Sequence, residues 1–451
     1  MVIFAYKSGK GQKGDKMASV SFTKEIPVRG EYDVVVCGGG PAGIGAAIAS
    51  AEKGAKTLLV ERFGFLGGMA TAGLVNPMSE FAYNNKRVIG GIPWRFAKAL
   101  EEAGGAIIEY PRCNISFNPE IYKLVAQRMV LSAGAELLTN TVLADCKLDD
   151  ARISEIYIVG KNGIEAIKGR YFIDATGDAS LAYFAGMEML ENTREMQPGT
   201  LCFTMSGVDT SSPRLNIIHQ KTQGINHQAL CIREPLLELK KKGVNVPQFG
   251  GPWLCTTLQE GVITLNLTRA AMDASDHDSY NAAERGLLED VFTLANLIKE
   301  NVREFENAYV SSIATITGTR QSRRIKGLHT VTGAEYASGV KYYDSIARAC
   351  HAIDIHLPNG EGQILKYPED AGYIPYDSMI NQKIENLIVA GRAISADEDA
   401  FAAIRVQAPC MEIGQAAGFA VNICMKNGAI SVSDIDRSEL VSEVREAGSF
   451  V

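Results

Sequence analysis

Apolar and small residues dominate the first structured part of the chain, and glycines interrupt them at short intervals. Residues 32–37 form an apolar run typical of a buried strand, and residues 38–43 form a glycine-rich break. The small apolar residues of 44–52 predict a helix, and the apolar run 57–60 predicts a second strand. This order predicts a βαβ unit, the building block of a Rossmann-like α/β fold.

Helical and strand patterns continue to alternate after this unit. Apolar residues at helical spacing predict a helix over 93–104. Asn118 is a good N-cap and Pro119 suits a first turn, so another helix is expected over 121–133. Further strands are expected over 136–138, 141–148, 155–159 and 171–174.

The pattern changes in the middle of the chain. Alternating apolar residues predict sheet strands over 200–206 and 261–267, and residues 283–302 show the apolar stripe of an amphipathic helix. A length of 451 residues also suggests two structural units. The expected division is a leader (1–30), a discontinuous nucleotide-binding domain (31–187 and 374–430), an inserted α+β substrate domain (188–373) and a C-terminal tail (431–451).

The glycine-rich break has the spacing of a dinucleotide-binding turn. Gly38, Gly40 and Gly43 match the pattern Gly-x-Gly-x-x-Gly. The first glycine permits a tight turn, the second lets the backbone approach a pyrophosphate, and the third lets helix and strand pack closely. Glu61 follows near the spacing of about 20 residues expected for an acid that binds ribose hydroxyls. The sequence therefore predicts a dinucleotide site.

Four segments carry a family resemblance: Glu-Arg-x-x-x-x-Gly-Gly-Met-x-Thr at 61–71, Ala-Thr-Gly-Asp at 175–178, and residues 385–392 and 405–418. In this order they resemble the FAD-dependent oxidoreductases of the glutathione-reductase fold, in the branch whose flavin domain is similar to that of fumarate reductase. The resemblance spans about residues 32–426. It implies an α/β, Rossmann-like FAD-binding domain with an inserted α+β substrate domain, and FAD as cofactor.

The resemblance, together with the turn, assigns FAD contacts to a set of residues. The family commonly has Gly-Asp after its last strand, with the acid on the ribityl chain, whereas this chain has Gly391-Arg392. Ser395, Asp397 and Asp399 are the alternatives for that role. The other residues expected at FAD are Pro41, Ala42, Arg62, Gly67, Gly68, Met69, Thr71, Val142, Ala175, Thr176, Gly177, Arg405 and Gly414.

Arg405 has three open interpretations. It lies just before a predicted helix, 411–424, whose positive N-terminal end would stabilise an anionic reduced flavin. Arg405 would add to that field, grip an anionic substrate, or form an ordinary surface ion pair.

Composition narrows the functional classes. The net charge of −7 argues against a general nucleic-acid binder, and the nine dispersed cysteines, with no Cys-x-x-Cys pair, predict neither a metal site nor disulfides. No stretch reaches 18 uninterrupted apolar residues, and the N-terminal apolar run is too short for a signal peptide. We expect a cytoplasmic protein without membrane or nucleic-acid partners; whether it forms a homo-oligomer is left open.

The densest basic cluster lies in residues 315–326 and contains Arg320, Arg323 and Arg324. One interpretation is a guanidinium clamp for substrate oxygens, centred on Arg320, and the other is a structural ion-pair network. If the segment is a strand, alternation of its side chains places Arg324 rather than Arg323 with Arg320.

His356 is the candidate catalytic base. Asp354 lies two positions earlier, so in a strand both side chains share one face and the carboxylate would orient the imidazole. The alternative is a histidine that is merely hydrogen-bonded at a strand end.

These features predict an FAD-dependent oxidoreductase that moves a hydride between a polar small molecule (a sugar, alcohol or hydroxy acid) and flavin N5. The alternative is reduction of an activated C=C bond, with an arginine as proton donor and clamp, and a less favoured one is an RNA-modifying flavoprotein. No second Gly-x-Gly-x-x-Gly unit occurs in mid-chain, so NAD(P)H binding is not expected. A separate electron donor or acceptor is expected instead.

Overall fold

A mixed sheet forms the centre of the computed structural model, which describes residues 20–215, 230–256, 258–358 and 362–451. Its seven strands have the order β7-β2-β1-β10-β9-β8, with β19 also paired to β10. Strands β7, β2, β1, β10 and β19 are parallel, whereas β9 and β8 continue from β10 as antiparallel strands. The bounds are β1 Val28–Cys37, β2 Thr57–Val60, β7 Glu136–Leu138, β8 Val142–Asp149, β9 Arg152–Gly160, β10 Gly163–Asp174 and β19 Leu387–Val389.

The carboxyl ends of the parallel strands meet at one edge of this sheet. Cys37 of β1 lies beside Val60 of β2 and Asp174 of β10, and Asp174 lies beside Val389 of β19. Ligands of open α/β sheets bind at this edge, where chain segments leave the strands in different directions. The predicted α/β class with a Rossmann-like parallel sheet is confirmed.

Helices α1 (Pro41–Glu52) and α10 (Gln407–Asn427) lie against each other through small residues. A Cβ at Gly414 would lie 1.9 Å from the carbonyl oxygen of Ala42, and one at Gly418 would lie 2.6 Å from the Ala49 Cβ. Only glycine permits this approach. The same core contains the apolar sides of α2 (Gly91–Glu102) and α3 (Pro119–Ser132).

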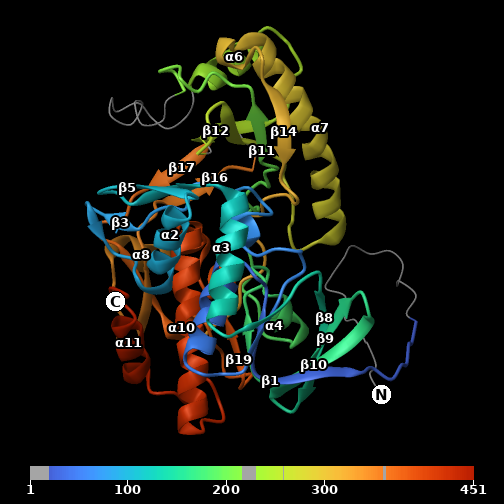
Figure 1. Ribbon diagram of the computed structural model, residues 1–451, viewed down its shortest axis with the longest axis vertical. Helices are drawn as coiled ribbons and strands as arrows, with labels where there is room; N and C mark the ends of the chain where they lie inside the picture. Colours follow the sequence, from blue (N-terminus) through green and yellow to red (C-terminus); the bar gives the residue numbers. More distant parts are fainter. Residues whose placement is uncertain (1–19, 216–229, 257, 359–361) are drawn as a thin grey trace.

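A second sheet lies at the other end of the molecule (Figure 1). Its four antiparallel strands have the order β12-β13-β11-β14, and the long helix α7 packs on them around a separate apolar core formed mainly by residues 201–314. Asp276 caps α7 by accepting a hydrogen bond from Ser279. The bounds are β11 Phe203–Ser206, α6 Leu230–Lys241, β12 Phe249–Thr256, β13 Val262–Thr268, α7 His277–Asn301 and β14 Tyr309–Ile313.

Smaller elements connect the two sheets and complete the first core. Residues 331–374 contribute apolar side chains to the core beneath α10, although they belong to the segment expected as substrate domain. The domain boundaries therefore stay a prediction. The remaining bounds are β3 Ala82–Tyr83, β4 Lys86–Arg87, β5 Ala106–Glu109, β6 Asn114–Phe117, α4 Ser180–Phe184, α8 Gly333–Ser338, β15 Ser345–Ala349, β16 Ile353–His356, β17 Gln363–Lys366, β18 Gly372–Pro375, α9 Glu398–Ile404 and α11 Arg437–Glu446, with short 3-10 turns at Gly68–Ala70, Arg303–Phe305, Tyr376–Ser378 and Gly391–Ala393.

Several expected boundaries differ from the structure. Strand β1 begins at Val28, inside the expected leader, because Val28 pairs with Ala166 of β10; residues 1–19 of that leader lie outside the described part. The segment with Arg320 and Arg324 is not a strand, since only isolated bridges form there, at Gly318 and Ile325. The tail contains a packed helix, α11, with Leu440 and Val444 in the core.

The contact between α1 and α10 predicts a sharp difference between two glycines. Gly414→Ala places its Cβ on a carbonyl oxygen and should destabilise the protein by about 1–3 kcal/mol, as overpacking does. Gly286 lies on the exposed face of α7 with no atom near its would-be Cβ, so Gly286→Ala should stabilise slightly, by about 0.5–1 kcal/mol. Chemical denaturation measures both. Equal effects of the two substitutions would contradict this packing.

Burial of Glu412 in α10 predicts a pH-dependent stability. Its carboxylate accepts hydrogen bonds from the backbone of Gly90 and Arg348, yet burial raises its pKa from 4.5 to about 7. A folded-state pKa above the unfolded value stabilises the protein fully below the unfolded pKa, and this contribution disappears as the pH rises through the folded pKa. Wild-type protein should therefore lose on the order of 3 kcal/mol between about pH 4.5 and pH 7 from this group. Chemical denaturation across this range should show that the free energy of unfolding of Glu412→Gln depends less on pH than that of wild-type protein. An equal dependence on pH would contradict the assignment.

Candidate functional site

The turn between β1 and α1 has the geometry expected of a pyrophosphate cradle. Gly38 has a φ of +102°, and a Cβ at Gly43 would lie 1.7 Å from the Gly38 carbonyl oxygen, so both positions require glycine. Gly40 differs, because the nearest atom to its would-be Cβ is the Gly68 Cα at 3.9 Å. Open space before the N-terminus of α1, where backbone N–H groups are unpaired within the helix, suits a phosphate group.

Glu61 closes this turn from the end of β2. Its carboxylate accepts hydrogen bonds from the backbone N–H of Gly39 at 2.6 Å and of Phe63 at 2.9 Å. Burial raises the pKa of Glu61. The side chain therefore holds the glycine turn in place, and its predicted contact with ribose stays a prediction. Arg62 lies exposed over the Phe63 ring.

The Gly-Gly-Met segment faces the same turn. Gly67 donates its N–H to the Gly39 carbonyl at 2.8 Å, and Gly68, with a φ of +51°, lies opposite Gly40. Thr71 donates its hydroxyl to the Leu66 carbonyl at 2.8 Å and so fixes the short turn that contains Met69. The structure therefore brings the residues of the first two motifs together.

The third motif leaves the carboxyl end of β10. The buried Asp174 accepts hydrogen bonds from Thr176 and Ala182, which shapes the turn from Ala175 onward. Asp178 forms an ion pair with Arg392 at 2.7 Å. Burial alone would raise the pKa of Asp178, but the charge of Arg392 and a hydrogen bond from Ser322 lower it.

Arg392 therefore connects the segments that follow β10 and β19. Its guanidinium lies over Gly177, where a Cβ would be 3.0 Å from its central carbon, and Gly391 has a φ of +83°. Arg392 thus occupies the place that the family resemblance gave to an acid, and the carboxylate here comes from Asp178 instead.

The three alternative ribityl contacts already have partners. Asp397 caps α9 through Ala400 and also accepts from Gly333, and Asp399 pairs with Arg194. Ser395 exchanges a hydrogen bond with Thr330. Val142 is 50% exposed at the start of β8, beside Thr141, whose N–H bonds the Glu61 carbonyl. Its predicted position near an adenine stays a prediction.

Arg405 lies at the junction of α9 and α10 and is not a surface residue. Its guanidinium reaches the Asp354 carbonyl at 3.2 Å and the Asp354 carboxylate at 3.5 Å. Gln407, the first residue of α10, donates to the Val75 carbonyl at 2.7 Å. Within the described residues, Arg405 Nε and Gln407 Oε1 are buried without a partner. Arg405 and Gln407 lie just before and at the N-terminus of α10.

His356 and Asp354 meet as the spacing predicted. Asp354 Oδ2 lies 3.1 Å from His356 Nε2, and both residues are buried on β16. Burial, followed by the charge of Arg320, lowers the pKa of His356 to about 3. Burial would raise the pKa of Asp354, but its hydrogen bond with His356 and the charges of His356 and Arg405 lower it well below the usual range.

Arg320 and Arg324 contact different groups. Arg320 donates to the Pro198 carbonyl and to Thr200 Oγ1, at 2.7 and 2.8 Å. Arg324 donates to the Ala396 carbonyl at 2.7 Å and to Asn192 at 2.7 Å. The expectation that strand alternation places Arg324 with Arg320 is wrong in its premise, because the segment is not a strand. A role for Arg324 in the site stays a prediction without support from these contacts.

A further arginine of this site escaped sequence analysis. Arg269 follows β13, is 1% exposed, and donates to the same Thr200 and Asn266 oxygens that Arg320 contacts. A single arginine at a strand end carries no distinctive sequence pattern. The one available signal was its position directly after an expected strand.

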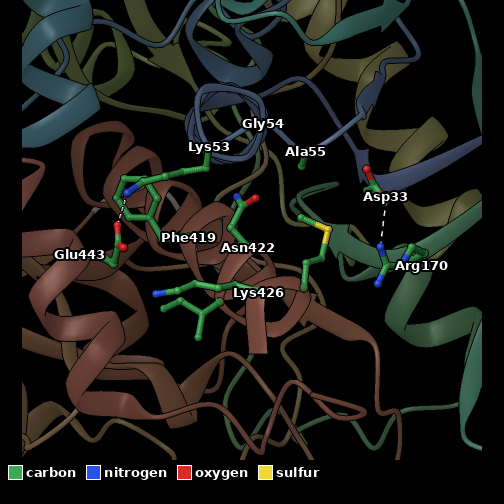
Figure 2. A pocket seen from close by; sticks show the side chains of 11 residues that line it. Asp33, Lys53, Gly54, Ala55, Arg170, Phe419, Asn422, Lys426 and Glu443 are labelled. Carbon is green, nitrogen blue, oxygen red and sulfur yellow. Dashed lines mark hydrogen bonds and ion pairs between the residues drawn. The ribbon is translucent and has the colours of Figure 1, made fainter. Parts of the chain in front are cut away.

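Figure 2 shows a cavity at the C-terminal end of α1, the opposite end from the glycine turn. It has a volume of about 430 Å³ and is lined by residues that follow the C-terminal end of α1, including Lys53 and Gly54. Its charged side chains are paired, as in the Asp33–Arg170 bridge at 3.2 Å and the Lys53–Glu443 bridge. It is therefore not part of the cofactor turn.

The described residues contain neither a metal-type cluster nor a membrane-spanning helix. No group of three or more His, Cys, Asp or Glu side chains is placed to hold a metal ion. In the same part of the chain, the helices are all too short or too polar to cross a membrane.

Comparison with known proteins identifies one family over most of the chain. The model of the family described as FAD dependent oxidoreductase matches residues 33–446. The thiamine thiazole synthase of Methanococcus vannielii is 31% identical over 168 residues, which is 34% of this chain and 58% of that protein. The digeranylgeranylglycerophospholipid reductase 2 of Methanopyrus kandleri is 28% identical over 198 residues, 40% of this chain and 46% of that protein. The chain thus spans about half the length of these relatives.

Among solved structures, a geranylgeranyl bacteriochlorophyll reductase-like protein from Thermoplasma acidophilum has 14% sequence identity, with a TM-score of 0.47. The match covers 92% of this chain and 82% of the other. The predicted FAD-dependent oxidoreductase family and its FAD are confirmed by the family match. Neither of the two sequence relatives bears the name of a fumarate reductase, so the expected fumarate-reductase branch stays a prediction.

The open space at Gly40 predicts a substitution that removes the cofactor without unfolding the chain. Gly40 has a φ of −72°, so Gly40→Val is tolerated by the backbone, but its side chain would enter the space for the pyrophosphate. We expect colourless protein whose melting temperature equals that of wild-type protein stripped of FAD. Absorbance at flavin wavelengths and thermal denaturation measure the two effects. A yellow Gly40→Val protein with full FAD content would contradict the assignment.

Proposed function

The chain belongs to the FAD dependent oxidoreductases, and on this premise we propose that it oxidises a hydroxyl group of a polar small molecule such as a sugar, alcohol or hydroxy acid. FAD, when bound, accepts or donates hydride at N5. The observation that supports the proposal is the buried pair of His356 and Asp354, 3.1 Å apart. Arg405 contacts the same carboxylate and precedes α10, whose N-terminus lies beside the cofactor motifs.

His356 would take the hydroxyl proton. Asp354 faces Nε2, so a proton held on Nε2 leaves Nδ1 as the acceptor. With a pKa of about 3 the ring is neutral at pH 7, which is the form that a base requires. The pKa of His356 must then rise when substrate binds, because a weak base removes an alcohol proton slowly.

Arg320 would hold a polar edge of the substrate. Its Nη1 is fixed by Pro198 and Thr200, so the orientation of the guanidinium is set before substrate arrives. A fixed guanidinium gives directional, charge-assisted hydrogen bonds to oxygen. Positioning of this kind is a large part of what a protein contributes to a reaction between two bound groups.

Reduction of an activated C=C bond is the second candidate. Burial, and next the charges of Arg269 and Arg405, lower the pKa of Arg320 well below its ordinary value, which favours proton release. The name of the Methanopyrus kandleri relative is that of a reductase. The thiazole synthase matches cover only about a third of this chain, so we do not extend that activity to it.

The electron partner is proposed to be separate from the chain. The sequence lacks a second dinucleotide-binding turn, so NAD(P)H should reduce the protein slowly or not at all. The arginine-rich segment does not favour an RNA substrate, because Arg320 and Arg324 are buried and bonded within the protein.

Substitution of His356 separates the catalytic from the structural interpretation. His356→Ala should retain FAD and lose about 10²–10⁴-fold in the rate of flavin reduction by the true substrate. His329→Ala is the matched control, since His329 lies beside Glu335, outside the site. Anaerobic stopped-flow measures oxidised protein against alcohols and hydroxy acids, and reduced protein against enoates.

An unchanged rate of flavin reduction in His356→Ala would show that this histidine has a structural role and is not the base. Rapid reoxidation by an enoate, without reduction by any alcohol, would favour the second candidate.

A further inference from the structure

The guanidinium groups of Arg269 and Arg320 lie side by side near His356, just beyond the end of β13. Arg269 Nη1 donates to Thr200 Oγ1 at 2.7 Å and to Asn266 Oδ1 at 2.9 Å. Arg320 donates to the same two oxygens, at 2.8 and 3.4 Å. Both side chains are buried. Two like charges sharing neutral acceptors repel each other, and neutral oxygens do not balance their charge.

Arg269 also retains two unused donors. Among the described residues, its Nε and Nη2 are buried and have no hydrogen-bond partner. These two N–H groups lie on one edge of the guanidinium plane and point in parallel, which is the geometry that receives both oxygens of a carboxylate or phosphate. Buried donors without partners are rare and costly, so this edge requires an explanation.

The surrounding charges do not balance within the protein. Arg269, Arg320 and Arg405 are close enough that burial and their mutual repulsion lower the pKa of Arg320. Asp354 is the acid that acts on all three, and its carboxylate is already taken by His356, Gln363 and Arg405. With His356 neutral, three positive charges face one negative charge. A buried excess of this kind calls for an anion.

We propose that Arg269 and Arg320 bind an oxyanion group of the substrate, a carboxylate or a phosphate, and thereby select a small organic anion. This inference rests on the proposed function and narrows it: among sugars, alcohols and hydroxy acids, it selects a molecule whose hydroxyl-bearing carbon lies near an anionic group. The pair recognises the anionic end, and His356 receives the hydroxyl proton.

Anion binding would also activate the base. The charges of Arg320 and Arg269 both lower the pKa of His356. An oxyanion on the pair offsets those charges, so the imidazole becomes more basic only when a substrate with the right group is in place. Specificity and proton transfer are then coupled through the same two guanidinium groups.

The test uses the FAD-loaded protein and binding alone, without turnover. Malonate and inorganic phosphate are the anionic probes and malonamide is the neutral analogue, at constant ionic strength. Calorimetric titration and the shift of the flavin absorption band report binding. We expect saturable binding of malonate or phosphate at least tenfold tighter than that of malonamide, and whichever anion binds identifies the oxyanion class.

Arg269→Lys should lower the affinity for the anion roughly ten- to hundredfold and leave the FAD content unchanged, because an ammonium group cannot reproduce the two parallel donors. Arg348→Lys is the matched control: Arg348 is also buried and has an unpartnered Nε, but it pairs with Asp370 and bonds the Ala371 carbonyl. Its anion affinity should match that of wild-type protein. If Arg269→Lys does not fold, the preference of wild-type protein for malonate or phosphate over malonamide remains the deciding measurement.

Equal affinity for malonamide and both anions, or unchanged anion affinity in folded Arg269→Lys, would overturn the inference. His329 lies outside the site beside Glu335, so His329→Ala keeps the arginine pair and should bind the anion within about threefold of wild-type protein. Tight anion binding together with no oxidation of any hydroxy acid would leave the pair in place and reject the dehydrogenase proposal. Oxidation of neutral alcohols without any anion binding would reject the oxyanion site at Arg269 and Arg320 and leave the dehydrogenase proposal in place.

Discussion

The close contact between α1 and α10 is the constraint on which the site depends. Ala42 of α1 lies against Gly414 of α10, and Ala49 lies against Gly418, so the two helices run in the same direction. Their N-terminal ends therefore face the same side of the molecule, and the positive ends of their dipoles add there. The first N-terminus follows the glycine turn, and the second follows Arg405. The glycines thus position the turn that is predicted to hold the pyrophosphate, and they bring both helix N-termini to one side of the molecule.

The buried arginines around Asp354 lower the stability of the fold. A core that served stability alone would not hold Arg269, Arg320 and Arg405 around a single carboxylate, because apolar residues would cost less there. The unpartnered atoms of Arg269, Arg405 and Gln407 add to that cost. Arg269 differs from the other arginines in having two unpartnered donors on one edge of its guanidinium, and a bound oxyanion would complete them.

Sequence reasoning succeeded where the signal is local. Strand β2 and the N-cap of α3 at Asn118 were predicted at their observed positions, because a glycine turn and an Asn-Pro start are complete within a few residues. The contact of Asp354 with His356 followed from strand alternation. The start of α7 was missed by several residues, although Asp276 and Ser279 form a recognisable cap.

The arginines show why the rest of the site was out of reach. The alternation that paired Arg324 with Arg320 requires a strand, and the segment instead runs between two sheets with isolated bridges. Arg269 is distant from Arg320 in sequence. The pairing of β13 with β11, continued by the bridge between Gly199 and Ala270, brings Arg269 to Thr200.

The ion pair of Arg392 and Asp178 shows the same limit within a recognised motif. The sequence had indicated only a departure from the family pattern at Arg392. The structure shows that this cation is balanced by an acid supplied from the neighbouring strand end, 2.7 Å away. The positive charge of Arg392 follows β19, and the carboxylate that balances it follows β10. The two groups meet because β10 and β19 are neighbours in the sheet. The sequence of one motif therefore does not reveal the partners that its residues find in another motif.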